Sequence, residues 1–387
     1  MPRAHRQHIL FTLPDLHPGG GQVSILRTAG ELARRGYRIT ALTVWRDTPP
    51  SMLDAYRATF DRVESLQLRR SRPDRALVRL RRLMRELDPD LVHATNTPWD
   101  LRMAVVGARM ARVPIVNTFT SMLFGDMRTL ARRLERRCFR GHLHGAVAVS
   151  PVVMDSWAAV MDAYEIPVDY RRTISPGILP FPLEPAARAD ARRRLREEHG
   201  IDERATVIVN LARLVPGKGQ LDLVSAFARV LPEHPGAHLM LAGEGPQREA
   251  LEHRIASLGL DGSVTLLGHR DDPQTVLAAG DLLAFPSHGE GFGLAVGEAM
   301  VAGLPVVAYD LPAVRWFCPD GEAGLLVRAG DVEAFAGALA TLLGDPGLRS
   351  RMGANGMALI ERDHLVGCCV DRLEELYGAV APHRDRT

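Results

Sequence analysis

A chain of 387 residues is long enough for two domains of ordinary size, and its 46% hydrophobic and 24% charged residues are typical of a soluble globular protein. No stretch approaches the ~18 consecutive apolar residues that span a bilayer, and the short apolar run near the N-terminus lacks the form of a signal peptide. Composition therefore favours a cytoplasmic protein over a membrane-spanning or secreted one, and we expect no nucleic-acid partner.

The net charge of +2 hides an uneven distribution. Residues 1–178 carry 28 Arg against 17 Asp and Glu, an excess of +11, whereas the remainder carries an excess of −9. The first half could therefore face an anionic surface, or the difference could be a drift in composition between two domains. The chain also has 47 Arg but a single lysine, Lys218, and a site that requires a compact point charge does not easily take an Arg instead.

The first half alternates short apolar runs with amphipathic segments. Three glycines after the first run, Gly19–Gly21, predict a turn before a helix that ends near Gly36. A further helix is expected over Arg75–Leu87. Strands are expected at His8–Thr12, Ile39–Val44, Leu91–His93, Ile115–Thr118 and Ala146–Val149. Short buried strands that alternate with helices indicate a parallel sheet covered on both faces.

The alternation breaks at Ser175–Pro182, where three prolines and a glycine predict a linker or hinge. It restarts after a charged helix at Pro185–Gly200. The strands expected beyond that helix are Thr206–Asn210, His238–Ala242, Val264–Leu267, Leu282–Ala284 and Pro305–Ala308. A last helix near Leu365–Tyr377 could pack back across the hinge.

We therefore predict an α/β protein with two Rossmann-like, doubly wound parallel-sheet domains that face each other across a cleft. The N-terminal domain would cover residues 1–178 and the C-terminal domain residues 179–364. Residues 365–387 would form the helix that packs back on the first domain. Ligands in such folds bind beyond the carboxyl ends of the strands, so the turns after the strands are where chemistry is expected.

Several common motifs are absent from these turns. Neither Gly19–Gly21 nor Gly243–Gly245 is followed by the third glycine of a dinucleotide fingerprint, and Gly217-Lys218 lacks the flanking residues of a Walker loop. Asp88-Pro89-Asp90 is typical of a turn rather than of a metal-binding carboxylate pair. Hydride transfer and nucleoside triphosphate hydrolysis thus lose their support, and no metal site is expected. The cysteines show no metal-ligand spacing and are expected to be reduced thiols: Cys138, Cys318, Cys368 and Cys369.

Two cations follow the strand Thr206–Asn210 on a loop that contains Gly and Pro. Arg213 and Lys218 stand five residues apart. Two cations at the carboxyl end of a strand can hold a pyrophosphate, Arg through two hydrogen bonds and Lys as a point charge. Isolated surface cations are usually just solvated, but because Lys218 is the only lysine, a functional role is favoured here.

The most informative segment, Ser287–Met300, follows an apolar strand and opens a helix. Glycines around Glu290 permit positive φ angles and a close backbone approach, and the start of a helix suits a phosphate. Glu298 lies eight residues further on, roughly 12 Å away if both residues are helical. That separation exceeds the ~5 Å of a retaining hydrolase pair but suits two sugars, a transferred hexose and a nucleotide ribose. A glycine-rich turn that binds nothing is the alternative.

At these residues the chain resembles the retaining glycosyltransferases of the family-four type, which have the two-Rossmann glycosyltransferase-B fold. The resemblance covers nearly the whole chain, and its most specific part is the pair of glutamates eight residues apart. The matching positions are the N-terminal glycine turn, Arg213 with Lys218, Gly243–Pro246, Glu290 with Glu298, and Pro305–Val307.

The resemblance implies a donor substrate, a nucleotide diphosphate sugar, with a UDP-sugar as the first choice, and neither a metal nor a cofactor. Arg213 and Lys218 would bind the diphosphate and stabilise charge on the leaving group. Glu290 would hold hydroxyls of the donor sugar, so these three residues form the expected catalytic set. Glu298 would hold the ribose. The other donor-binding positions implied are Gly20 and Gly21 in the N-terminal turn, Arg270 beside the base, and Gly291, Phe292, Gly293 and Leu294.

The sequence departs from the family pattern at two positions. Ala212 replaces the glycine that usually precedes the clamp arginine. Thr120 stands where many relatives carry a histidine near the reacting sugar, which puts the acceptor side in question: Thr120 could bind the sugar or be inert. His93 ends a strand near the cleft and is either an acceptor-side residue or a structural histidine.

One feature of the N-terminal half suggests a membrane surface. If Asp126–Arg140 is helical, four arginines form a single stripe: Arg128, Arg132, Arg136 and Arg140. A basic helix of this kind can rest on anionic lipid at the inner face of the membrane. A solvated helix face in an Arg-rich protein explains the pattern equally well.

Together these observations predict a retaining, metal-independent hexosyltransferase that uses a nucleotide sugar. Its acceptor would be a lipid-linked or polysaccharide precursor or a small-molecule natural product. Two alternatives stay open: a nucleotide-sugar 2-epimerase of the same fold, for which no dense cluster of carboxylates and histidines is seen, and a catalytically silent nucleotide-sugar-binding protein.

Overall fold

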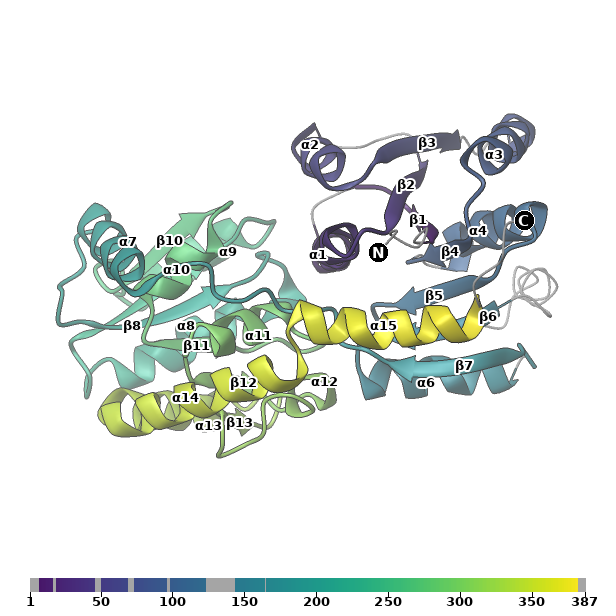
Figure 1. Ribbon diagram of the computed structural model, residues 1–387. Helices are drawn as coiled ribbons and strands as arrows, with labels where there is room; N and C mark the ends of the chain where they lie inside the picture. The colour runs from purple at the N-terminus through teal and green to yellow at the C-terminus, as the bar shows by residue number, and fades with distance from the viewer. Residues whose placement is uncertain are drawn as a thin grey trace. The chain divides into compact units, whose positions relative to one another are not determined.

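The computed structural model describes residues 7–16, 19–45, 50–68, 73–95, 98–122, 143–163 and 165–381. The chain divides into two compact units (Figure 1). Unit 1 consists of Met1–Gly177 and Val366–Thr387, and unit 2 consists of Ile178–Leu365. Each unit is built on its own parallel sheet.

The described part of unit 1 contains a seven-stranded parallel sheet in the order β3-β2-β1-β4-β5-β6-β7. Its strands are β1 His8–Leu13, β2 Arg38–Trp45, β3 Arg62–Leu68, β4 Leu91–Ala94, β5 Ile115–Phe119, β6 Leu143–Ala148 and β7 Val168–Thr173. The central strands β1 and β4 are buried along their whole length, as expected for a parallel sheet with helices on both faces.

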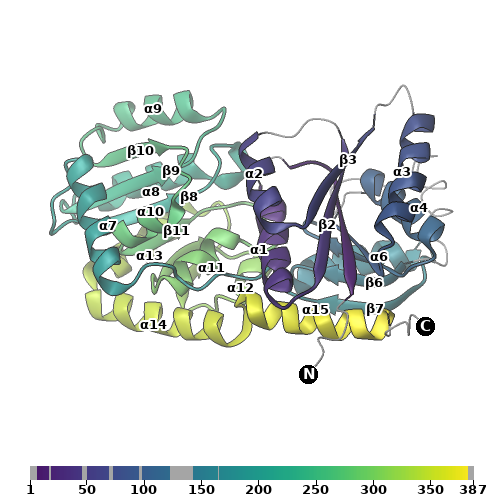
Figure 2. The same cartoon turned by 45° about the horizontal axis from the view of Figure 1, so that its top comes forward.

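The helices of unit 1 close around this sheet (Figure 2). They are α1 Gly20–Arg34, α2 Pro50–Thr59, α3 Pro73–Leu87, α4 Pro98–Ala111, α6 Pro151–Ala163 and α15 Val366–Val380. Helix α15, drawn in yellow, comes from the far end of the sequence and lies beside α1. Arg35 bonds to Asp371 and Glu374 of α15, both at 2.5 Å. Val370 and Tyr377 of α15 belong to the same buried apolar cluster as β1.

Unit 2 contains a six-stranded parallel sheet in the order β10-β9-β8-β11-β12-β13. Its strands are β8 Thr206–Leu211, β9 Ala237–Ala242, β10 Val264–Gly268, β11 Leu282–Phe285, β12 Val306–Tyr309 and β13 Gly324–Val327. Its helices are α7 Pro185–Glu198, the 3-10 turn η1 Pro216–Lys218, α8 Gln220–Val230, α9 Arg248–Ser257, α10 Pro273–Ala279, α11 Leu294–Val301, α12 Pro312–Arg315, α13 Val332–Gly344 and α14 Pro346–Asp363.

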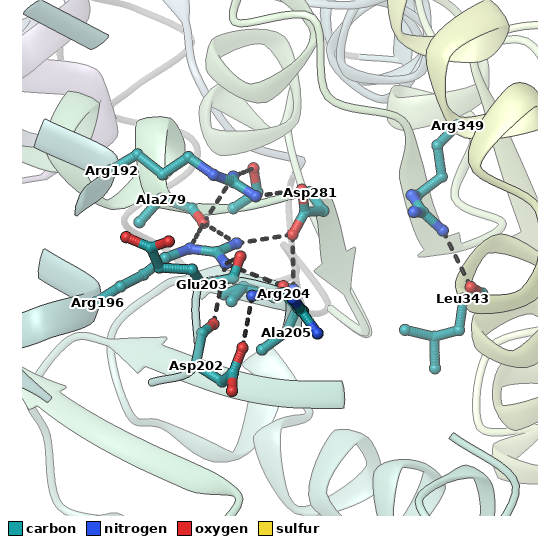
Figure 3. Close-up of polar contacts among 12 residues, drawn as sticks. Arg192, Arg196, Asp202, Glu203, Arg204, Ala205, Ala279, Asp281, Leu343 and Arg349 are labelled. Carbon is teal, nitrogen blue, oxygen red and sulfur yellow. Dashed lines mark hydrogen bonds and ion pairs between the residues drawn. The ribbon is translucent and has the colours of Figure 1, made fainter. Parts of the chain in front are cut away.

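A buried arginine fastens α7 to the amino end of this sheet (Figure 3). The Arg196 side chain is 2% exposed, and its guanidinium donates to the carbonyl oxygens of Ala279 and Ala205 and to Asp281 Oδ2 at 2.9 Å. Asp281 Oδ2 also accepts the Val207 N–H of β8 at 2.8 Å. A buried charge is tolerated only when paired and hydrogen-bonded in this way. The cluster therefore secures the edge of the sheet opposite to the carboxyl ends of its strands.

The predicted pair of doubly wound parallel sheets is confirmed, and every expected strand is present within three residues of its predicted bounds. Three strands were not predicted: β3, β7 and β13. All three are edge strands, and in β3 and β7 polar side chains interrupt the continuous apolar run of a central strand.

The predicted glycine turn is wrong in one detail. Gly20 and Gly21 lie in the first turn of α1, and Gly19 is the extended N-cap residue with φ −171°. The stripe Arg128, Arg132, Arg136 and Arg140 and the thiol of Cys138 lie outside the described residues. No helix in the described ranges is both long and apolar enough to cross a bilayer.

Candidate functional site

The candidate site in unit 2 lies where its sheet reverses direction. Strands β8 and β11 are neighbours at the centre of the sheet, and the chain winds outward from them in opposite directions, to β9 and β10 on one side and to β12 and β13 on the other. Ligands of doubly wound folds bind at the carboxyl ends of such a strand pair. The two loops that follow, residues 212–219 after β8 and 286–293 after β11, carry six of the nine site residues predicted in unit 2.

Hydrogen bonds hold the two loops against each other. The His288 N–H donates to the Gly217 carbonyl at 2.9 Å. Gly219 begins α8 with φ +69°, and a Cβ on it would lie far closer than 3.0 Å to the Pro286 carbonyl oxygen. Only glycine combines that left-handed backbone with so close an approach. The register between the loops is therefore fixed at the backbone level.

This register brings Lys218 and Glu290 together. Lys218 Nζ lies 2.5 Å from Glu290 Oε1, and the two side chains are 24% and 13% exposed. Ser287 Oγ, 1% exposed, donates to the same carboxylate oxygen at 2.8 Å. Because both bonds fall on Oε1, Glu290 Oε2 has no protein partner within unit 2, all of whose residues the structure describes. The carboxylate is thus oriented and keeps one oxygen for hydroxyl groups.

Arg213 stands on the same loop with an exposed side chain that makes no ion pair to any described residue. The backbone of this loop packs against the turn that follows β9. The Leu214 N–H donates to the Glu244 carbonyl at 2.9 Å, and a Cβ on Gly243 or Gly245 would collide with the backbone of residues 212–214. The glycines of this turn are therefore needed for packing against the loop of residues 212–219, which carries Arg213 and Lys218. Ala212 causes no visible distortion, since its N–H still donates to Ala242.

The segment after Glu290 turns into α11. Gly293 is its N-cap with φ +102°, so Leu294 is the first helical residue. The Phe292 ring is 4% exposed and stacks on Phe317 with centroids 4.3 Å apart, so its side chain belongs to the core. Gly291 directly precedes it, and Glu298 lies half-buried in the second turn of the helix.

Arg270 follows β10, the outermost strand on its side of the sheet. Its guanidinium makes two hydrogen bonds of 2.8 Å to Asp272, the N-cap of α10. This pairing raises the pKa of Arg270 and lowers that of Asp272. None of its contacts joins Arg270 to the group around Lys218, so the structure places it at the same edge of the sheet but in a separate cluster.

Unit 1 has a pocket of its own at the carboxyl edge of its sheet, with a volume of about 30 Å³. Three predicted residues from distant parts of the sequence line it together: Gly21, His93 and Thr120. A Cβ on Gly21 would lie 3.7 Å from the Thr120 hydroxyl, which is ordinary contact distance. Gly20, one residue earlier, is exposed and does not line this pocket.

His93 is a buried, hydrogen-bonded histidine at the floor of this pocket. Its ring is 2% exposed and stacks on Phe11, with centroids 5.0 Å apart. Nδ1 contacts the hydroxyl of Tyr377, and Nε2 lies 2.7 Å from Thr118 Oγ1. Burial lowers the pKa of His93 to about 3, so the ring is neutral at physiological pH and is fully partnered.

Sequence reasoning missed three polar residues of these two sites. Ser287 begins the segment Ser287–Met300, and its position three residues before Glu290 could have indicated its role. Thr118 and Tyr377 could not be found from the sequence, because 259 residues separate them and only the return of α15 to unit 1 brings them to the two sides of His93.

Two protein-family models match the chain, one in each half. The model described as Glycosyltransferase Family 4 matches residues 18–178, and the model described as Glycosyl transferases group 1 matches residues 191–358. Together they account for most of the sequence.

Curated relatives include glycosyltransferases of several kinds. The lipopolysaccharide core biosynthesis glycosyltransferase LpsE of Rhizobium meliloti is 37% identical over 39% of this chain and 44% of its own length. The alpha-D-kanosaminyltransferase of Streptomyces kanamyceticus is 32% identical over 49% of this chain and 50% of its own. The D-inositol 3-phosphate glycosyltransferase of Acidothermus cellulolyticus is 29% identical over 89% and 82%. The chain thus spans about half the length of the first two relatives.

Solved structures share the fold. The Anabaena protein Alr3699/HepE, in complex with UDP and glucose, superposes with a TM-score of 0.82 at 22% identity, covering 97% of this chain and all of the other. WaaG, a glycosyltransferase involved in lipopolysaccharide biosynthesis, superposes with a TM-score of 0.71 at 19% identity, covering 97% of this chain and all of the other.

Proposed function

The chain belongs to the family-four type of glycosyltransferases, and on this premise we propose that it is a retaining hexosyltransferase that transfers a sugar from a nucleotide diphosphate donor to an acceptor hydroxyl. One observation carries the proposal: Lys218 and Glu290, from two loops at the point where the unit 2 sheet reverses, lie 2.5 Å apart. Arg213, which pairs with no described residue, stands on the loop of Lys218. Two cations and one oriented carboxylate are the groups that a sugar diphosphate requires.

Each charged group has a separate task in this scheme. As the bond between the anomeric carbon and the diphosphate oxygen breaks, both electrons leave with the diphosphate, and Lys218 and Arg213 stabilise that charge. Glu290, held at Oε1 by Lys218 and Ser287, accepts hydrogen bonds from sugar hydroxyls at Oε2. Electrostatic stabilisation by prearranged groups is commonly the largest contribution to catalysis.

Retention of configuration follows from the route proposed for the acceptor. The acceptor hydroxyl forms its new bond on the face that the diphosphate leaves, and its proton passes to the departing phosphate oxygen. No protein nucleophile is needed, and neither is a metal, since the cations of the clamp carry the compensating positive charge.

The remaining donor contacts are proposed from the family pattern. Glu298 would hold the ribose and Arg270 would flank the base, while Gly20 and Gly21 would approach the phosphates from unit 1. Further hydrogen bonds would come from the backbone of Gly291, Phe292, Gly293 and Leu294. The UDP complexes of the structural neighbour support a UDP-sugar as donor.

Two acceptor classes are supported by relatives: a polysaccharide or lipid-linked precursor, as the name of LpsE suggests, and a small-molecule natural product, as the name of the kanosaminyltransferase suggests. A peripheral contact with anionic lipid through Arg128, Arg132, Arg136 and Arg140 belongs to the first class. The relatives give no support to the 2-epimerase alternative. His93 and Thr120 are proposed to lie on the acceptor side, in the pocket of unit 1.

The proposal is tested by release of nucleotide diphosphate from a panel of UDP-, GDP- and ADP-sugars in the presence of a chelator, followed by mass spectrometry. We expect slow hydrolysis of one donor by the wild type and at least ~100-fold less by Lys218→Ala and Glu290→Gln. Arg229→Ala, which removes an exposed ion pair to Glu333 elsewhere in unit 2, is the matched control and should behave as wild type. The anomeric configuration of the transferred sugar is read by NMR.

Two results would reject parts of the proposal. Binding of a nucleotide sugar without turnover, over a broad acceptor panel, would identify a silent binding protein. A product of inverted configuration would exclude the same-face route while leaving the transferase assignment in place.

A further inference from the structure

The pocket of unit 1 has a polar lining without a charged side chain among the described residues. Its polar side chains are one imidazole and a set of hydroxyls: Ser24, Thr28, His93, Thr95, Thr118, Thr120 and Ser175. Several of these are already committed to the protein, since Ser24 donates to the Pro176 carbonyl and Thr95 to the Thr12 carbonyl. Thr118 and Thr120 retain hydrogen-bonding capacity at the pocket surface.

We propose that Thr118 donates a hydrogen bond into this pocket to an uncharged sugar oxygen, and that Tyr377 and His93 are positioning residues that aim its hydroxyl there. The inference rests on the proposed function for the identity of the ligand. The direction of the hydrogen bonds is inferred from the partners that the structure gives these groups.

The buried hydroxyl of Tyr377 fixes that direction. Tyr377 is 0% exposed, and the only partner of its hydroxyl group among the described residues is His93 Nδ1. A buried donor left without an acceptor is strongly disfavoured. Tyr377 therefore donates to Nδ1, and Nδ1 carries no proton.

The neutral imidazole then has its proton on Nε2. This N–H donates to Thr118 Oγ1 at 2.7 Å. The hydroxyl hydrogen of Thr118 is consequently turned away from the ring, and the structure gives it no acceptor among the described residues. Thr118 sits at the end of β5, half-buried on the pocket wall, so its free hydrogen serves a ligand there. Hydrogen bonds in such a chain polarise one another, which strengthens the last donor.

This series of hydrogen bonds, from Tyr377 through His93 to Thr118, forms only while His93 is neutral. A protonated ring would donate from both nitrogens and would face the donor of Tyr377. Burial of the ring, which lowers its pKa to about 3, excludes that state at physiological pH. The stack on Phe11 holds the plane of the ring between the two hydroxyls.

Size and charge define the ligand group. A volume of about 30 Å³ admits one or two groups of the size of water, such as a hydroxyl or a hydroxymethyl group of a sugar. A phosphate would find no cation in the described lining and would lose its hydration. The group could belong to the donor hexose or to the acceptor, and kinetics distinguish these two sources.

The tautomer of His93 is tested first, by NMR of protein labelled with 15N-histidine and assigned with His93→Gln. The expected spectrum at pH 7 shows an unprotonated Nδ1 and a protonated Nε2 for His93. A protonated Nδ1 would overturn the inference, because Thr118 would then donate to the ring and not to the pocket. This readout needs no turnover, so it can fail independently of the proposed transferase activity.

Hydrolysis of UDP-glucose, with and without myo-inositol or glucose 6-phosphate as added acceptor, tests the function of the chain of hydrogen bonds. Thr118→Val and Tyr377→Phe should each raise one KM by about 2- to 10-fold with a smaller change in kcat. The double variant should match Thr118→Val alone, and Thr118→Ser should restore the wild-type value. Tyr56→Phe is the control, since it removes the hydroxyl of another buried tyrosine of unit 1 that bonds to the Gln22 carbonyl.

The affected KM names the source of the hydroxyl. A higher KM for UDP-glucose without acceptor assigns the hydroxyl group to the donor sugar. An unchanged donor KM with loss of the acceleration by myo-inositol assigns it to the acceptor. The inference would be refuted if the variants behave like Tyr56→Phe in both assays. It would also be refuted if the wild type prefers glucose 6-phosphate, which is charged, over myo-inositol through this pocket, because the pocket is proposed to bind an uncharged group.

Discussion

Replacing Gly219 by alanine should separate the two loops of the unit 2 site without substituting any of its charged residues. Gly219 joins η1 to α8 with φ +69°, and a Cβ there would lie 2.1 Å from the Pro286 carbonyl oxygen. Real Cβ contacts stay beyond 3.0 Å, so one loop has to move by about 1 Å. Lys218 is the preceding residue, and Glu290 stands on the loop that would be displaced.

The size of the effect can be worked from these distances. The left-handed backbone costs an alanine roughly 1–2 kcal/mol, and relief of the collision adds a comparable amount, so unit 2 should lose about 2–4 kcal/mol of stability. For a unit of this size that corresponds to a fall in Tm of roughly 4–15 °C. A misplacement of about 1 Å between groups that act together costs about 100-fold in rate, so the larger effect should appear in kcat/KM.

Gly217 provides the matched control two residues earlier on the same loop. A Cβ on Gly217 would meet nothing within 4 Å, so Gly217→Ala should keep both stability and donor hydrolysis close to wild type. The measurements are Tm by differential scanning calorimetry and kcat/KM for nucleotide release from the donor. If Gly219→Ala and Gly217→Ala give the same kcat/KM, the argument that this backbone contact sets the distance between Lys218 and Glu290 is refuted.

Three further predictions concern stability and reactivity. Asp281→Ala should cost about 3–5 kcal/mol in urea unfolding because it leaves a buried guanidinium without its carboxylate. Asp190→Ala, which breaks exposed ion pairs, should cost far less, and equal losses would contradict this. Burial lowers the pKa of His93 to about 3 in the folded state, while the unfolded imidazole binds a proton below about pH 6.5. The free energy of unfolding should therefore fall as the pH falls from about 6.5 to about 3, by up to about 1.4 kcal/mol per pH unit. A His93→Gln variant that keeps the full slope would contradict this. Burial raises the pKa of Cys318 to about 12, so iodoacetamide at pH 8 should modify the half-exposed Cys368 and spare Cys318 until urea is added, as read by mass spectrometry.

The architecture could be predicted from the sequence because central strands of a parallel sheet are recognisable as short apolar runs. Strands β8 and β11 are examples, each buried and apolar and each followed by glycines. The edge strand β7, Val168–Thr173, carries no such signal, because it is half-exposed and contains two arginines. The start of α1 was misjudged for a related reason, since glycine disfavours helices in general but is tolerated in a first turn, where few backbone bonds depend on it.

Local motifs predicted the candidate site better than they predicted its contacts. Lys218 and Glu290 were both expected in turns after strands, where ligands of such folds bind, but the ion pair between residues 72 positions apart required the register of two loops. Arg270 shows the reverse case. Its place after a strand was predicted, and its carboxylate partner Asp272, two residues away, was overlooked because the spacing of a turn does not reveal side-chain direction.

The course of the chain between the units has a practical consequence for dissecting this enzyme. Unit 2 starts and ends at one place, where the Ile178 N–H donates to the His364 carbonyl at 2.8 Å, and in unit 1 Gly177 packs directly on Val366. In gene-design terms unit 2 is therefore an insertion within unit 1. A fragment cut after residue 177 would lack α15 and leave an apolar groove open, whereas a short linker from residue 177 to residue 366 would yield a continuous miniature of unit 1. The pocket of unit 1 could then be studied by crystallography and NMR without unit 2.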